Sequence, residues 1–204
     1  MSLATYNTKR NFKETSEPSG KKNEKKEEQL SFVVQRHKAS HLHYDFRLEM
    51  NGVLKSWAVP KGPSLNPQDK RLAMMVEDHP YGYKDFKGVI PEGNYGAGIV
   101  EIWDSGTYTS LENKGSAAED EKLLKAGLEA GNLKFTLHGK KLKGEFALVR
   151  LKDSNSNSWL LIKHRDSYAI DEDYSSEEDT PKNSPINKWL AEHKPEEKQA
   201  KKKS

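Results

Sequence analysis

The 204-residue sequence contains no cysteine, which excludes disulfide bonds and any metal site built on thiolates. It lacks an apolar run long enough to cross a membrane, and its start, MSLATYNTKR, lacks the apolar stretch of a signal peptide. The net charge is only +3, so overall charge says little about nucleic acid as a partner. These absences predict a cytoplasmic protein that has no membrane partner.

Apolar residues are few and unevenly placed along the chain. Only 33% of residues are hydrophobic, while 32% are charged. Both ends are poor in apolar side chains, and most apolar runs fall between residues 31 and 170. We therefore expect one compact domain at 31–170. Polar extensions are expected at 1–30, with a substrate-contacting segment, and at 171–204, with a short helix.

Short apolar runs separated by turn signals predict a mainly β fold. The expected strands are 31–35, 43–49, 54–59, 71–77, 98–103, 132–138, 144–151 and 158–163. Turns between them are expected at 51–52, 60–67, 104–106 and 153–158. Eight short strands with brief connections are typical of a sandwich or a closed barrel. We predict a compact antiparallel β-barrel of about eight strands.

One or two ancillary helices accompany these strands. The segment 116–131 has Ser116 as a candidate N-cap, acidic residues in its first turn, and Gly131 at its end. A second, shorter helix is expected at 184–193.

The stretch HLHYDFRLE, residues 41–49, alternates between two kinds of side chain. In a strand, successive side chains point to opposite faces. One face is apolar and typical of a core, with Tyr44, Phe46 and Leu48. The other face carries His43, Asp45, Arg47 and Glu49.

His43 and Asp45 lie two residues apart on the polar face, about 6.5–7 Å along a strand. Side chains at that spacing can converge on one divalent transition metal, which needs at least three nitrogen or oxygen ligands. His37 or His41 could supply the third ligand, and spacing alone leaves both open. The competing interpretation is a plain exposed polar face without a ligand.

Arg47 extends this face, and guanidinium groups are preferred partners of phosphate oxygens. His79 ends another predicted strand, in VEDHP. Metal ligands beside an arginine suit phosphoryl chemistry, in which positioning and charge stabilisation dominate. The glycine-rich run at 91–98 lacks the lysine and hydroxyl of a P-loop, so we interpret it as a structural loop.

Two long segments carry a family resemblance: FVVQRHKASHLHYDFRLEMNGVLKSWAVPKGPS and RLAMMVEDHPYGYKDFKGVIPEGNYGAGIVEIWDSGTY. They resemble the 3′-phosphoesterase module of bacterial DNA ligase D, which also occurs as a standalone protein in archaea and bacteria. LHGKKLKGEFALVRLK and SWLLIKHRD continue the resemblance, which covers roughly residues 10–170. It implies an enzyme of DNA repair that removes 3′-phosphates, and 3′-terminal ribonucleosides, from nucleic-acid ends.

The resemblance also implies a metal centre. In the family the metal, typically manganese, is held at positions that match His37, His43 and Asp45. This favours His37 over His41, whose position varies in the family. Zinc, cobalt or another divalent transition metal is the alternative to manganese.

Substrate contacts are implied in the same way. Residues that engage the phosphate match Arg47, His79 and Tyr83. Other positions linked to activity match Lys61, Arg71 and Glu77. Positions that handle the terminal ribonucleoside match Arg10 and Glu17. Asn11 stands where the family has aspartate, so its loss of charge predicts weaker removal of that nucleoside.

Together these features predict a hydrolase for DNA or RNA 3′ ends, with the polar face of residues 43–49 lining a groove inside the barrel. His79 would stabilise the transition state or protonate the leaving oxygen. A DNA ligase and a polymerase would be separate chains, since no motif of either occurs here. The alternatives are a non-catalytic barrel that binds single strands or ends, and a hydrolase of another phosphoester.

Overall fold

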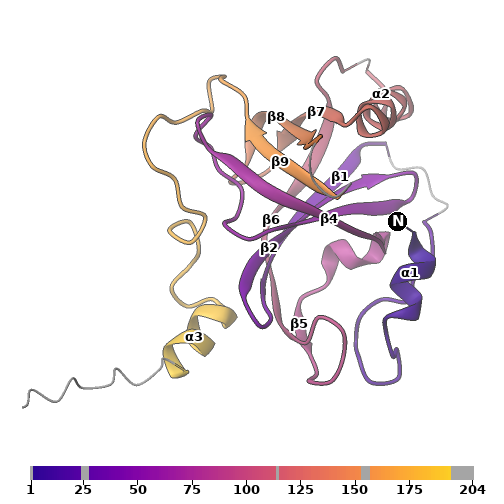
Figure 1. The fold of residues 1–204 in the computed structure, drawn as a ribbon, viewed down its shortest axis with the longest axis vertical. Helices are drawn as coiled ribbons and strands as arrows, with labels where there is room; N and C mark the ends of the chain where they lie inside the picture. The colour runs from indigo at the N-terminus through magenta and orange to yellow at the C-terminus, as the bar shows by residue number, and fades with distance from the viewer. Residues whose placement is uncertain (1, 24–27, 114, 153–156, 194–204) are drawn as a thin grey trace, which may run out of the picture.

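Eight antiparallel strands close into a barrel in the computed structural model, which describes residues 2–23, 28–113, 115–152 and 157–193 (Figure 1). Around the barrel they follow the order β1, β2, β3, β4, β9, β8, β7 and β6, and β6 pairs with β1 to close it. Their bounds are β1 Leu30–Lys38, β2 Leu42–Met50, β3 Val53–Val59, β4 Lys70–Pro80, β6 Gly98–Ser110, β7 Asn132–His138, β8 Lys143–Arg150 and β9 Ser158–Lys163. The predicted antiparallel barrel of about eight strands is confirmed.

Strand β6 is longer than the sequence pattern indicated, and the turn predicted at 104–106 is wrong. Those residues continue the strand, and Gly106 pairs with Phe32 of β1. A Cβ atom on Gly106 would lie 2.2 Å from the carbonyl oxygen of His138, so this glycine permits a close backbone approach within a strand. On its other edge β6 pairs first with a short strand, β5 (Gly88–Ile90), and then with β7.

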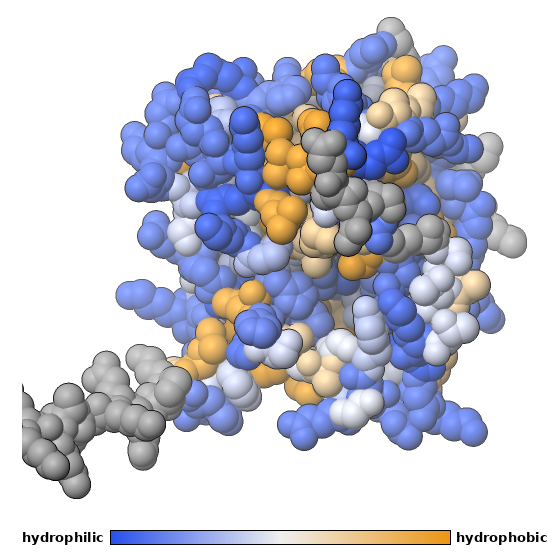
Figure 2. All heavy atoms as spheres, in the orientation of Figure 1, coloured by the Kyte–Doolittle hydropathy of each residue, from blue (hydrophilic) through white to orange (hydrophobic). Residues whose placement is uncertain are grey.

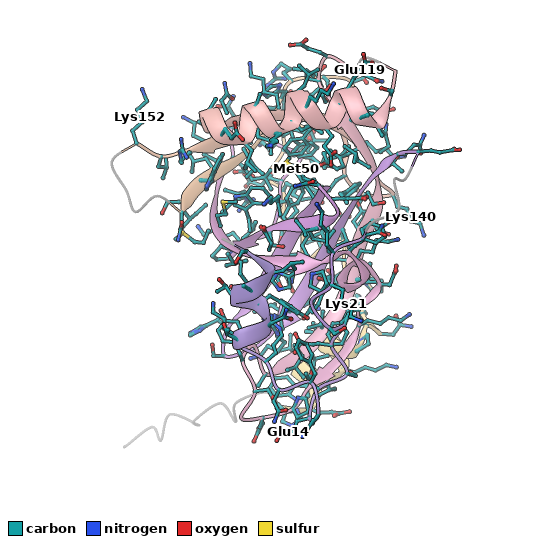
Figure 3. The ribbon with its side chains drawn as sticks, turned by 90° about the vertical axis from the view of Figure 1, so that its right-hand side faces the viewer. Glu14, Lys21, Met50, Glu119, Lys140 and Lys152 are labelled. Carbon is teal, nitrogen blue, oxygen red and sulfur yellow. The ribbon has the colours of Figure 1, made fainter. Side chains whose placement is uncertain are left out.

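Both predicted helices are present, as α2 (Ala117–Ala130) and α3 (Pro185–Glu192). The Ser116 side chain accepts a hydrogen bond from the Glu119 amide, and Gly131 ends α2 in the left-handed conformation with φ 76°. The sequence analysis missed a short helix α1 (Leu3–Thr8) and a 3₁₀ helix at Tyr81–Asp85. Figure 3 shows α2 across one end of the barrel and α1 against its side wall.

The apolar face of β2 points into the barrel. Tyr44, Phe46 and Leu48 are buried in a cluster to which all eight barrel strands contribute. The ring centroids of Phe46 and Phe135 are 5.9 Å apart although β2 and β7 are not neighbours, so these rings meet across the interior. Figure 2 shows that one outer face is mostly hydrophilic, with apolar groups gathered toward its middle.

The expectation of a polar groove inside the barrel is therefore wrong. An eight-stranded barrel is just wide enough for packed side chains, and here they are largely apolar and aromatic. Charged groups placed there would lose their hydration without replacement. The polar face of β2, including Asp45 and Arg47, thus lies on the outer wall.

We expect Phe135→Ala to lower the free energy of unfolding by about 3–5 kcal/mol, because it removes a ring from the middle of this interior. Phe135 is 0% exposed and packs against Phe46, Tyr108 and Phe146. Denaturant titration measures the change. Val89→Ala in β5 is the control, since that side chain is 63% exposed and should change stability by less than about 0.5 kcal/mol. Equal losses of stability in Phe135→Ala and Val89→Ala would contradict the placement of Phe135 in the barrel interior.

Both ends of the described chain contact the barrel. In the N-terminal segment, α1 packs on β4, and the buried Tyr6 donates a hydrogen bond to the Pro18 carbonyl oxygen at 2.8 Å. At the C-terminal side, the fully buried Arg36 donates to Glu177 at 2.9 Å. Residues 24–27 and 194–204 of the two predicted extensions, and 153–156 of a predicted turn, lie outside the described residues. No described helix combines the length and apolarity needed to span a bilayer.

Candidate metal and phosphate site

A pocket of about 290 Å³ lies on the outer wall of the barrel. It is bordered by β1 to β5, by the N-terminal segment, by the 3₁₀ helix, and by the loop between β5 and β6. The predicted site residues that line it are Arg10, His37, His43, Asp45, Arg47, Glu77, His79 and Tyr83. Segments far apart in the sequence thus converge on one place.

His37, His43 and Asp45 form a group that could hold a metal ion, with one donor atom from each lying within 4.8 Å of the others. The β1–β2 register places His37 opposite His43 and brings Asp45 beside them. His37 Nδ1 lies 3.6 Å from one Asp45 oxygen, and His43 Nε2 lies 3.7 Å from the other. Two ligand atoms that bind one ion at 2.0–2.2 Å lie no more than about 4.4 Å apart, and both of these His–Asp separations fall within that limit. His41 is exposed, and its ring is not part of this group.

Backbone carbonyls select the tautomer of each imidazole. His37 Nε2 donates to the Gly96 carbonyl oxygen at 2.9 Å, and His43 Nδ1 donates to that of His41 at 3.0 Å. Because a carbonyl only accepts, these nitrogens carry the hydrogens, and His37 Nδ1 and His43 Nε2 keep their lone pairs. Those are the two nitrogens that face Asp45. Two oriented imidazoles and one carboxylate fit a divalent transition metal.

Asp45 is buried but negatively charged. Burial alone would raise its pKa, but the Arg47 guanidinium holds the pKa well below its usual range. Arg47 Nη2 donates to Asp45 at 3.0 Å, and Arg47 Nε donates to the Gln35 side-chain oxygen at 2.7 Å. The third nitrogen, Nη1, is buried and has no hydrogen-bond partner among the described residues. An anion in the pocket would satisfy it.

His79 is buried and uncharged. Burial lowers its pKa well below the ordinary value, and the positive charges of Arg47 and Arg10 lower it further. Its Nδ1 donates to the Glu77 carbonyl oxygen at 2.9 Å, which leaves Nε2 as an acceptor 3.3 Å from Arg10 Nη2. The Nε2 lone pair therefore accepts a hydrogen bond from Arg10.

The N-terminal segment contributes a buried ion-pair network to the pocket. Arg10 Nε donates to Glu17 at 2.9 Å, and Arg10 Nη1 donates to Glu77 at 3.3 Å. The Tyr83 hydroxyl also donates to Glu17, at 2.9 Å. Burial raises the pKa of Tyr83 well above its ordinary value, so this hydroxyl keeps its proton. The Tyr83 hydroxyl thus holds the Glu17 carboxylate in place, and the Tyr83 ring lines the pocket.

Four predicted residues do not line this pocket, and one of them, Glu17, is buried and contacts it only through Arg10 and Tyr83. Lys61 and Arg71 border a different hollow, where Arg71 donates to Asp69 at 2.7 Å and to the Tyr174 carbonyl oxygen at 2.8 Å. Asn11 is exposed, and its side-chain oxygen accepts from the Lys13 amide. Their roles in activity stay predictions.

The sequence analysis missed four residues of the site: Lys9, Gln35, Tyr95 and Gly96. Gln35 precedes His37 by two positions on β1 and therefore shares its face. Lys9 is next to Arg10 and donates to Glu77 at 3.0 Å. Tyr95 and Gly96 belong to the glycine-rich run at 91–98, which was interpreted as purely structural.

Comparisons with known proteins match one family. A family model described as the DNA Ligase D 3'-phosphoesterase domain matches residues 35–150. The "Multifunctional non-homologous end joining protein LigD" of Pseudomonas aeruginosa is 50% identical over 169 residues, which are 82% of this chain and 19% of that protein. The protein of the same name from Mycolicibacterium smegmatis is 42% identical over 164 residues, 80% of this chain and 21% of that protein. The chain thus spans about a fifth of the length of these relatives.

Proposed function

Because the chain belongs to the DNA ligase D 3′-phosphoesterase family, we propose that it is a metal-dependent enzyme that heals the 3′ ends of nucleic acids. It hydrolyses a terminal 3′-phosphate to a 3′-hydroxyl, and it removes a 3′-terminal ribonucleoside to expose such a phosphate. One observation carries the proposal. The group His37, His43 and Asp45, which could hold a metal, is hydrogen-bonded through Asp45 to an arginine that has a free buried donor.

His37, His43 and Asp45 would hold the cation, for which we propose manganese, with zinc or cobalt as alternatives that accept the same donors. When bound, the cation supplies Lewis-acid activation of a phosphate oxygen and of the attacking water. Arg47 binds the non-bridging oxygens through Nη1. Its other two nitrogens are held by Gln35 and Asp45, so the guanidinium is already oriented before substrate arrives.

His79 exchanges a proton with the leaving oxygen. Its Nδ1 hydrogen is committed to the Glu77 carbonyl, so Nε2, which accepts from Arg10 in the free protein, is the nitrogen that can take up a proton. Positive charges from Arg10 and Arg47 disfavour a proton there in the free protein. A bound phosphate offsets those charges, and this allows Nε2 to hold a proton for the leaving group.

Partners follow from the relatives. Those proteins are named as multifunctional end-joining proteins, and about four-fifths of their length lies outside the match. We propose that the chain acts on DNA or RNA 3′ ends, and that a ligase and a polymerase supply the joining and filling steps.

A direct assay tests this function with primer–templates that end in a 3′-phosphate or a 3′-ribonucleoside. We expect conversion to a 3′-hydroxyl with manganese, weaker conversion with magnesium, and loss of conversion when a chelator is added. Binding of the ends without hydrolysis under any metal would instead favour a non-catalytic end-binding barrel. Hydrolysis restricted to mononucleotides would favour a different phosphoester as substrate.

A further inference from the structure

Tyr95 stands out among the aromatic residues of the pocket by its exposure. Its side chain lines the same pocket as the candidate metal ligands, yet the residue is 49% exposed. Tyr83, the other tyrosine in that lining, is 2% exposed. Single exposed apolar residues are common on protein surfaces, so it is the position of this ring in the lining of a charged pocket that makes it a candidate for ligand contact.

The loop that carries Tyr95 is attached to the metal centre. The carbonyl of the next residue, Gly96, accepts the hydrogen bond from His37 Nε2 at 2.9 Å. Gly96 has φ 76°, a conformation that favours glycine. Two turn hydrogen bonds, Asn94 N to Pro91 O at 3.3 Å and Ala97 N to Asn94 O at 3.1 Å, close the loop. The backbone beside Tyr95 is thus anchored at a set position relative to His37.

Cations surround this ring. Lys9 Nζ lies 4.5 Å from the ring centroid and 3.4 Å from the hydroxyl oxygen, and Arg10 Cζ lies 5.4 Å from the centroid. An exposed aromatic ring with cations beside it suits a strand of nucleic acid, in which a base stacks and the backbone meets positive charge. A phosphate group without a base would use only the charged residues.

We propose that Tyr95 forms a binding subsite for the nucleobase of the terminal nucleotide, by stacking of the base on its ring. The inference rests on the proposed function and deepens it. The subsite takes any of the common bases, because each has a π-face and no base-specific hydrogen bond is required. Such a subsite gives the pocket a means to distinguish a nucleic-acid end from a simple phosphate ester.

The test compares two strands that carry a 3′-phosphate, one on a normal terminal nucleotide and one on a stable abasic analogue. Tyr95→Ala should raise KM for the normal strand by about 5- to 150-fold, the range of measured base stacking. It should leave KM for the abasic strand unchanged. Tyr95→Phe should behave as the wild type with both strands, because the ring and not the hydroxyl carries the contact.

Tyr168→Ala is the matched control, since Tyr168 is 51% exposed and lies outside the pocket lining. An equal rise in KM for both strands in Tyr95→Ala would overturn the inference, because it would show that Tyr95 only supports the loop. An unchanged KM would overturn it as well. If the wild type hydrolyses neither strand, the proposed function fails. Fluorescence anisotropy of the labelled strands then still tests the subsite, through the same difference between normal and abasic ends.

Discussion

Replacing Asp45 with alanine should lower the affinity for a divalent cation by at least about 100-fold and remove 3′-phosphatase activity with it. Asp45 is the only carboxylate of the group, and its two oxygens face His37 Nδ1 at 3.6 Å and His43 Nε2 at 3.7 Å. Without it, two neutral nitrogens would face a cation beside the positive charge of Arg47. Loss of an outer partner of a ligand already costs about 10- to 100-fold in metal affinity, so loss of a ligand should cost more.

Isothermal titration with manganese measures the affinity, and conversion of a 3′-phosphate measures activity. Asp45→Asn is a second variant that keeps the volume and an acceptor for Arg47 but not the charge, so it separates loss of metal from loss of fold. The control is His41→Ala. It removes an exposed imidazole next to the site and keeps the carbonyl that binds His43 Nδ1. Wild-type manganese affinity in Asp45→Ala would show that the ion binds elsewhere.

The alternating pattern at 43–49 predicted which side chains of β2 share a face, because two-residue periodicity is a property of any strand. It also indicated that the apolar face belongs to a core, but not that this core fills the whole barrel interior and leaves the polar face outside. That depends on closure of the sheet, which brings Phe135 of β7 opposite Phe46 and fills the interior with rings. Interactions across a barrel join residues that are distant in sequence, so no local pattern contains them.

The candidate site likewise combines residues that local spacing predicts with residues that only the fold brings together. His43, Asp45 and Arg47 follow one another along one strand, and spacing alone made them candidates. Spacing left His37 and His41 open, because the answer depends on the register between β1 and β2, which sets His37 across from His43. The contact of Gly96 with His37 spans 59 positions and uses a backbone carbonyl, which every residue has. Such a contact gives no signal in the residue type.

Replacing Arg47 with lysine should lower kcat/KM for a 3′-phosphate strand by roughly 100- to 1,000-fold, although the charge is kept. The guanidinium makes two contacts at once, to Gln35 through Nε and to Asp45 through Nη2, and leaves Nη1 for the phosphate. An ammonium group has a single nitrogen and no planar fork, so it cannot hold both partners and still meet a phosphate oxygen. Steady-state kinetics with manganese measure the loss.

Arg165→Lys is the matched control, because Arg165 is exposed, pairs with Asp171 at 2.7 Å and lies outside the pocket lining. Near-normal turnover in Arg47→Lys would show that charge alone suffices and that the oriented fork has no role. Titration with manganese distinguishes Arg47→Lys from Asp45→Ala. Arg47→Lys keeps all three candidate ligands and should keep manganese affinity within about tenfold of the wild type, the lower bound of outer-partner effects. Asp45→Ala should lose both manganese affinity and turnover, because Asp45 joins the metal ligands to the arginine.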